Sequence, residues 1–153
     1  MKVDIETDIS KDHGEDIKVK IEASEYTKEL GYIIEMLQNF TVEIDTLLGR
    51  RDNEISIINI KDVINFYSEE SKTYCKTSKG VFSVKQKLYE LEEILPQKDF
   101  IRISNSTIVN IKYVDCFDVG VVGDIIIKFK DGSKEYVSKR KISNVMKFLK
   151  DRR

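Results

Sequence analysis

A run of polar residues between apolar anchors, within residues 100–114 (FIRISNSTIVNIKYV), constrains this fold most strongly. Ser104, Asn105, Ser106 and Thr107 are consecutive, so they lack the 3.6-residue spacing of an amphipathic helix. Apolar residues flank them, at positions 100, 101, 108 and 109. The segment is therefore expected to form a polar loop held out by a packed scaffold, where binding residues are often found.

Strand and hairpin patterns surround this segment. Asp131-Gly132 is a hairpin turn signal, and Ser78-Lys79-Gly80 separates two short apolar-alternating runs. Strands are expected at residues 54–60, 62–70, 73–77, 81–84, 113–119, 124–130 and 134–138. Two short helices are expected, at residues 84–95 before Pro96 and at the end of the chain, where Ile142, Val145, Met146 and Leu149 form an apolar stripe. Paired helices of the helix-turn-helix kind are not expected.

The first 46 residues predict a different unit. Residues 2–8 and 16–23 alternate polar and apolar residues like strands, with a turn at 10–15 between them. Tyr26, Leu30, Ile33, Ile34 and Leu37 then follow a helical spacing, with Ser24 as the expected N-cap. The predicted fold is mainly β (α+β overall): a strand-strand-helix extension, residues 1–46, before an elongated antiparallel hairpin domain with short helices, residues 47–153.

Charge is distributed unevenly along the chain. Residues 1–46 hold 5 Lys/Arg against 12 Asp/Glu, a net charge of −7. Residues 47–99 hold 9 of each, and residues 100–153 hold 12 Lys/Arg against 6 Asp/Glu, a net charge of +6. This gradient favours a polyanion-binding surface near the C-terminal end, although charges of this kind also occur on ordinary solvated faces.

Composition argues against several other classes. Cys75 and Cys116 lack metal-ligand spacing and lie in apolar or aromatic runs, so they are expected to be buried free thiols; His13 is the single histidine. The sequence contains no recognisable nucleophile–base pair, phosphate loop or cluster of carboxylates. We therefore expect no enzyme activity, metal site or cofactor. No apolar run reaches the length of a membrane span, and no signal peptide is recognised, so a cytoplasmic location is expected.

Chemistry suited to polyanions concentrates at a few positions. Lys139, Arg140 and Lys141 are consecutive before the last helix, where an arginine could bind guanine or phosphate through two hydrogen bonds. Ser104 and Asn105 offer neutral donors and acceptors for backbone and base edges, or could simply satisfy a turn.

Residues from about 50 to 153 resemble the LytTR DNA-binding domain of bacterial transcription regulators. The resemblance is carried by INIKDVINFYSEESKTYCKT, LYELEEIL, FIRISNSTIVN and YVSKRKISNVMKFL. It implies an antiparallel fold that binds double-stranded promoter DNA, at paired repeats, through loops inserted into successive major grooves. The implied DNA-binding residues are Lys72, Ser104, Asn105, Lys139 and Arg140, with Arg102 as a support for its loop.

The first 46 residues resemble the short extension of stand-alone regulators of this family and are too short for a receiver domain. We expect them to serve homodimer formation or contact with a regulatory membrane protein. The competing interpretation is a protein-interaction module whose basic C-terminal face binds an acidic partner instead of DNA.

Overall fold

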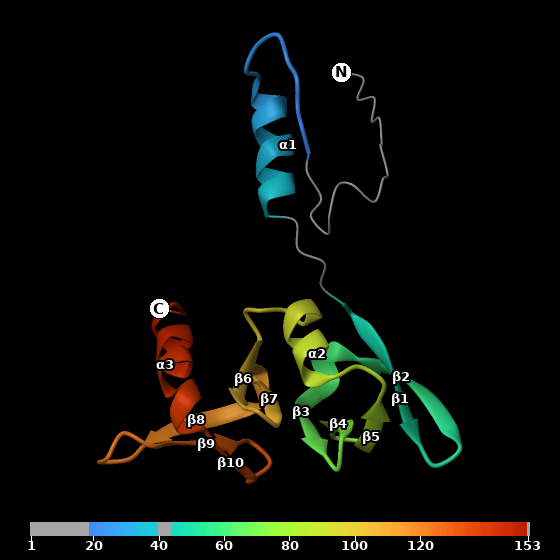
Figure 1. Ribbon diagram of the computed structural model, residues 1–153, viewed down its shortest axis with the longest axis vertical. Helices are drawn as coiled ribbons and strands as arrows, with labels where there is room; N and C mark the ends of the chain where they lie inside the picture. Colours follow the sequence, from blue (N-terminus) through green and yellow to red (C-terminus); the bar gives the residue numbers. More distant parts are fainter. Residues whose placement is uncertain (1–18, 40–43, 153) are drawn as a thin grey trace. The chain divides into compact units, whose positions relative to one another are not determined.

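The structure is a computed structural model that describes residues 19–39 and 44–152 (Figure 1). The chain divides into two compact units, residues 1–40 and 41–153. The expected boundary between residues 46 and 47 falls inside the first strand of the second unit, which begins at Thr46.

The described part of the first unit contains one helix, α1 (Lys28–Gln38). Thr27 caps it, because the Thr27 Oγ1 accepts a 3.2 Å hydrogen bond from the Leu30 N–H. The helix prediction is thus confirmed, but the N-cap is Thr27 and not Ser24. Residues 19–23 form no strand, in contrast to the prediction for 16–23: Val19 and Ile21 are exposed, and the described residues supply no strand to pair with them. The predicted strand 2–8 and turn 10–15 lie outside the described residues.

The second unit is built on two antiparallel sheets. The larger has seven strands in the order β2-β1-β5-β4-β3-β7-β6, and the smaller has the order β10-β9-β8. The strands of the larger sheet are β1 (Thr46–Arg51), β2 (Glu54–Asn59), β3 (Val63–Glu69), β4 (Lys72–Thr77), β5 (Gly80–Val84), β6 (Phe100–Ser104) and β7 (Thr107–Asn110). Those of the smaller sheet are β8 (Val114–Val119), β9 (Ile125–Phe129) and β10 (Lys134–Tyr136).

Short helices complete the second unit. The α-helices are α2 (Leu88–Ile94) and α3 (Ile142–Lys150), and 3-10 helices span Ile60–Asp62, Ile111–Tyr113 and Lys139–Lys141. Helix α2 starts later than the predicted residue 84, because Val84 is the last residue of β5. Its first turn is closed by Glu90, whose Oε2 accepts a 2.7 Å hydrogen bond from the Lys87 N–H.

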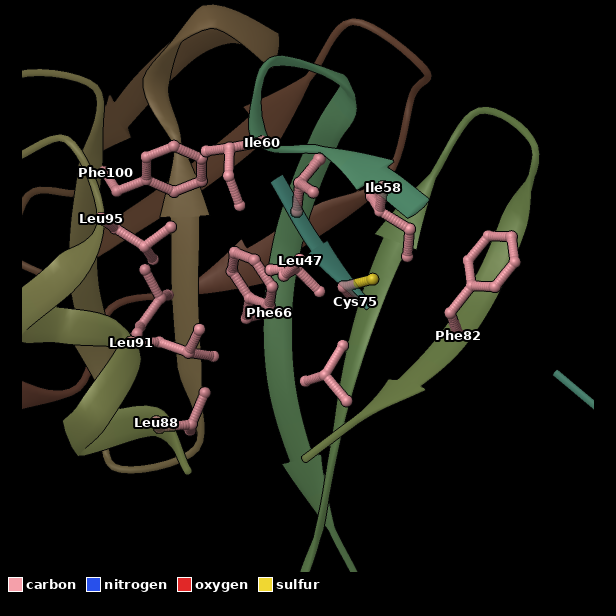
Figure 2. Packing of buried hydrophobic residues seen from close by; sticks show 13 residues of the cluster. Leu47, Ile58, Ile60, Phe66, Cys75, Phe82, Leu88, Leu91, Leu95 and Phe100 are labelled. Carbon is pink, nitrogen blue, oxygen red and sulfur yellow. The ribbon is translucent and has the colours of Figure 1, made fainter. Parts of the chain in front are cut away.

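Strands β3 and β7 of the larger sheet are covered on both faces. Residues 63–66 of β3 and all four residues of β7 are buried without alternation, as expected for strands between two packed layers. On one face, α2 places Leu88, Leu91 and Leu95 against Phe66 and the neighbouring strands (Figure 2). On the other face, the smaller sheet and α3 contribute a second core. The residues of that core are Ile64, Ile103, Val109, Ile125, Ile127, Phe129, Val137 and Val145.

These elements confirm the predicted fold class, mainly antiparallel β with short helices. Two further features of the second unit differ from the prediction. The strand β1 was not anticipated, and the polar loop at 104–107 is much shorter than expected. Ser104 ends β6 and Thr107 begins β7, so only Asn105 and Ser106 form the turn.

Candidate nucleic-acid interface

Three polar segments meet at one end of the larger sheet. They are the β3–β4 turn at Glu70-Ser71, the β6–β7 turn at Asn105-Ser106, and the 3-10 helix Lys139–Lys141. A 2.9 Å hydrogen bond from the Ser68 N–H to the Ser106 carbonyl joins the two turns. A second bond, from the Ser138 N–H to the Ile103 carbonyl at 2.9 Å, fixes the start of the basic segment beside β6. Segments far apart in sequence are therefore held side by side by the backbone.

The β6–β7 turn is held in place by Arg102. The Arg102 Nε donates to the Ser104 carbonyl at 3.0 Å, and its NH2 donates to the Asn105 carbonyl at 2.7 Å. The remaining nitrogen, NH1, forms a 2.9 Å ion pair with Glu92 of α2. Since each of the three nitrogens of the guanidinium contacts the protein, Arg102 orients the turn.

Ser104 and Asn105 differ in how free their side chains are. The Ser104 Oγ accepts a 3.2 Å hydrogen bond from the Ser106 N–H and lies 3.3 Å from the Ser106 Oγ. Ser104 is half-buried, whereas Asn105 is exposed at the tip of the turn. The geometry therefore places the Asn105 amide outward and leaves Ser104 mainly as a residue that shapes the turn.

The β3–β4 turn is backbone-strained. Glu70 has φ +48° and Ser71 has φ +64°, the left-handed region that glycine and asparagine favour. The next residue, Lys72, is exposed and begins β4. The turn is braced by Lys87, whose Nζ donates a 3.0 Å hydrogen bond to the Ser71 carbonyl. Strain of this kind costs about 1–3 kcal/mol per residue and is found where a protein holds a functional loop in place.

The basic segment forms a 3-10 turn that continues directly into α3. Lys139 and Arg140 are exposed, while Lys141 is half-buried. The Lys141 N–H donates to the Ser138 carbonyl at 2.8 Å and closes the turn. The two cations at the tip thus project from a short, fixed element between β10 and α3.

Charges behind this surface are paired. Lys76 of β4 binds Asp131 at 3.0 Å, and hydrogen bonds from Ser133 together with Lys76 lower the pKa of Asp131 to about 2. Lys76 therefore stabilises the junction of the two sheets and is not a candidate for ligand binding. Lys112 pairs with the largely buried Asp99 at 3.2 Å.

The cysteines are free thiols in different environments. Cys75 is buried in the first core, and burial raises the pKa of its thiol to about 11. Cys116 is exposed on β8, so the prediction that both thiols are buried is wrong for Cys116. The apolar neighbours of Cys116 did not reveal this, because β8 lies in the small second sheet and only Val114 and Phe117 of its six residues pack against the core.

The structure brings Lys72, Ser104, Asn105, Lys139 and Arg140 to one end of the sheet. Sequence reasoning did not single out Lys87, which supports the strained turn from the opposite side of β4. No sequence signal marked it, since its role depends on where the chain between β5 and α2 passes. Among the described residues, no group of three or more His, Cys, Asp or Glu side chains could hold a metal ion. None of the helices in that part of the chain is long and apolar enough to cross a membrane.

An antiparallel scaffold that presents polar turns and a short basic segment is typical of a nucleic-acid-binding domain that reads its target through loops. The model of the LytTr DNA-binding domain family matches residues 53–150, and the chain belongs to this family. This membership confirms the prediction that the protein is a DNA-binding transcriptional regulator. The family consists of DNA-binding proteins and not of enzymes.

Related proteins agree with this assignment. The chain is 41% identical over 104 residues to proteins named as uncharacterized HTH-type transcriptional regulators from Staphylococcus aureus strains NCTC 8325 and COL. The match covers 68% of this chain and 70% of each relative. A solved LytTr DNA-binding domain from Bacillus cereus has a TM-score of 0.67, with 22% identity, over 69% of this chain and 97% of that chain. This structural likeness confirms the fold.

The relatives' names refer to a helix-turn-helix, which the described residues of this chain do not contain. Several strands separate α1 from α2, and others separate α2 from α3, so no two α-helices are joined by a short turn. The described residues therefore contain no helix pair that could recognise DNA in the manner of a helix-turn-helix.

Proposed function

We propose that the protein regulates transcription by inserting the β3–β4 turn, the β6–β7 turn and the Lys139–Lys141 segment into the major groove of promoter DNA. The observation that carries this proposal is the pair of backbone hydrogen bonds, Ser68 to Ser106 and Ser138 to Ile103, that gathers the three segments. Each segment then carries an exposed residue suited to DNA: Lys72, Asn105 and Arg140.

The residue types suggest distinct roles. Arg140 is suited to two hydrogen bonds with guanine, and the Asn105 amide to two with adenine. Lys72 and Lys139 supply point charges for phosphates, which position the protein on the duplex without reading sequence. Ser104, whose hydroxyl is engaged within the turn, is assigned a backbone contact at most.

The decisive experiment compares Asn105→Ala and Arg140→Ala with the parent protein. The probe is a duplex selected from a random pool by the parent, titrated by fluorescence anisotropy. Each variant should lose about 1–3 kcal/mol of specific binding, or about 5- to 150-fold in Kd. Asn53→Ala and Arg152→Ala serve as matched controls, since both residues are exposed but lie outside the three segments. Equal binding by all five proteins would contradict the site.

We further propose that two copies occupy paired promoter repeats as a homodimer, in the cytoplasm, with residues 1–46 as the association region. Helix α1 supports this, because none of its residues is buried although Leu30, Ile33, Ile34 and Leu37 form an apolar stripe. An isolated helix of 11 residues is marginal in water, so a partner surface would stabilise it.

The other partner proposed for residues 1–46 is a membrane protein that restrains the regulator. Sedimentation and co-purification from membranes distinguish self-association from binding to a membrane protein, with Ile33→Glu as the disrupting variant. A lower mass for the variant supports self-association, and loss of a membrane-bound fraction supports the membrane partner. If neither property changes, the region has neither role.

The alternative function, a protein-interaction module, is favoured only by the basic charge of residues 100–153. Selection from the random duplex pool discriminates the two. Failure to enrich any sequence would support an acidic protein partner in place of DNA.

A further inference from the structure

A groove lies over the neighbouring strands β1, β5 and β4 of the larger sheet and over the chain that follows β5. Only Gly49 and Arg50 of β1 pair with β5, whose last residue is Val84. The chain then leaves the sheet toward α2. The groove has a volume of about 710 Å³.

Positive charge dominates the lining of this groove. Arg50, Arg51, Lys72 and Lys87 contribute four cations, and Asp52 is the one carboxylate among the lining residues. Polar groups of Ser83 and Tyr74 lie between them, and Arg50, Ser83 and Tyr74 are directly opposite one another across three strands. The side chains of this row therefore share one face of the sheet.

Two of the four cations are partly engaged. The Arg51 NH1 donates to the Lys79 carbonyl at 2.9 Å, and its guanidinium lies 4.8 Å from the centre of the Phe82 ring. Lys87 donates one hydrogen bond, to the Ser71 carbonyl. Lys72 and Arg50 are exposed at the two ends of the groove, and neither side chain has a hydrogen-bond or ion-pair partner among the described residues. Glu69 and Glu54 lie opposite Lys72 and Arg51 on the neighbouring strands, but neither forms an ion pair with them within 4.0 Å in the described residues.

We propose that this groove binds the phosphate backbone of the DNA duplex that the protein recognises, with Arg50 and Lys87 as phosphate-binding residues. The inference rests on the proposed function and extends its surface, because Lys72 directly follows the β3–β4 turn and also lines the groove.

The spacing fits a nucleic-acid strand. Arg50 lies two strands and two residues away from Lys72, so their Cα atoms are about 12 Å apart at a strand spacing of about 4.8 Å and a rise of about 3.3 Å. One DNA strand advances about 3.4 Å per nucleotide along the helix axis, so the groove spans about three nucleotides. Contacts to phosphates bind any sequence, in contrast to those proposed for Asn105 and Arg140.

The test uses Arg50→Gln, Lys87→Gln and the double variant, with Lys61→Gln as the matched control. Lys61 is exposed and precedes β3, at the end of the sheet opposite the β3–β4 turn. Binding to the selected duplex and to a scrambled duplex is titrated from 50 to 200 mM salt. Each lost phosphate contact should reduce the slope of log K against log salt by about 0.9. The double variant should weaken binding to both duplexes by the same factor, whereas Lys61→Gln should leave both unchanged.

Several outcomes would overturn the proposal. An unchanged slope for Arg50→Gln and for the double variant, while Asn105→Ala still loses specific binding, would leave the proposed function intact and remove the groove from it. Loss confined to the selected duplex would mean that the groove reads bases. An unchanged slope with altered sedimentation would assign the groove to an acidic segment of a second copy. Arg50→Gln removes no internal hydrogen bond in the described structure, so thermal unfolding should confirm that its fold is intact.

Discussion

The Arg102 guanidinium donates a 2.7 Å hydrogen bond to the backbone carbonyl of Asn105 and thereby fixes the residue at the tip of the β6–β7 turn. Its second contact to the turn is the Ser104 carbonyl, and its third partner is the Glu92 carboxylate on α2. Arg102 is only partly accessible, with 18% of its side chain exposed. The orientation of the most exposed candidate for base recognition thus depends on an arginine that faces the protein.

Replacing Arg102 by Gln should therefore reduce sequence discrimination without removing a DNA contact. The turn loses its two bonds from the guanidinium, so Asn105 samples more conformations and binding to the selected duplex should fall several-fold. The free energy of unfolding should fall by about 1–2 kcal/mol, because charge-assisted bonds are strong but Glu92 is partly solvated. Anisotropy titration and urea unfolding measure the two effects.

Arg102→Lys separates geometry from charge. Lysine keeps the positive charge but cannot bind two carbonyls and a carboxylate through a planar group, so it should behave like Arg102→Gln. If the lysine variant restores discrimination, Arg102 acts through its charge and not by holding the turn.

The sequence predicted the hairpins and the basic segment, since their signals are local. Alternation and the Asp131-Gly132 turn located the strands of the second sheet, and the stripe around Val145 located α3. The strand β1 was missed because its pattern, TLLGRR, contains a glycine and two arginines. It becomes a strand by pairing with β2, a context that single-strand propensity does not describe.

The candidate site was only partly predictable for the same reason. Asn105 and Arg140 lie in segments whose polarity is visible in the sequence. Their proximity depends on the hydrogen bond between Ser138 and Ile103 and on the burial of Val137 and Val145 in the second core. The support from Arg102 and Lys87 likewise depends on tertiary contacts. The shortening of the loop to a two-residue turn follows from pairing of Ser104 with Thr107, which the run of polar residues concealed.

The two cysteines should react very differently with alkylating reagents. Iodoacetamide at pH 8 should label Cys116, which is exposed, and spare Cys75, which is buried and whose thiol pKa is raised to about 11. Mass spectrometry of native and urea-unfolded protein measures the label at each site. Equal labelling rates in the native protein would show that Cys75 is accessible.

Cys75 also predicts a loss of stability in alkaline solution. The folded thiol keeps its proton up to about pH 11, whereas the unfolded thiol releases it near its ordinary value of 9.0. The folded state therefore binds more protons between these values, and the free energy of unfolding should fall as pH rises from 9 to 11. Cys75→Ala should show a smaller decline than the parent over this range, despite a lower stability at pH 7 from the lost packing.

Asp131 predicts the opposite dependence in acid. Its pKa is lowered from 3.8 to about 2 by hydrogen bonds from Ser133 and by Lys76. The unfolded state binds the proton first, so the stabilising contribution is complete above about pH 4 and is lost as pH falls toward 2. Asp131→Asn should flatten the unfolding profile over this interval. A matched replacement, Asp52→Asn, serves as the control, because Asp52 lies in the β1–β2 turn away from Lys76. Identical profiles for the parent and Asp131→Asn would contradict the assigned interaction.

The β3–β4 turn should gain stability from residues that favour its backbone. Both central positions, Glu70 and Ser71, have positive φ, and Asn-Gly is the preferred pair for such a two-residue hairpin turn. The double replacement Glu70→Asn, Ser71→Gly should therefore raise the free energy of unfolding by about 1–3 kcal/mol, measured in urea. Lys79→Gly in the β4–β5 turn is the control: Lys79 has no positive φ, so added glycine freedom should lower stability by about 0.5–1 kcal/mol.

Because Glu70 also places a negative charge beside Lys72, the double variant should bind scrambled duplexes more tightly, with a steeper salt dependence. A stabilised turn with weaker DNA binding would instead show that Glu70 or Ser71 contacts the DNA itself.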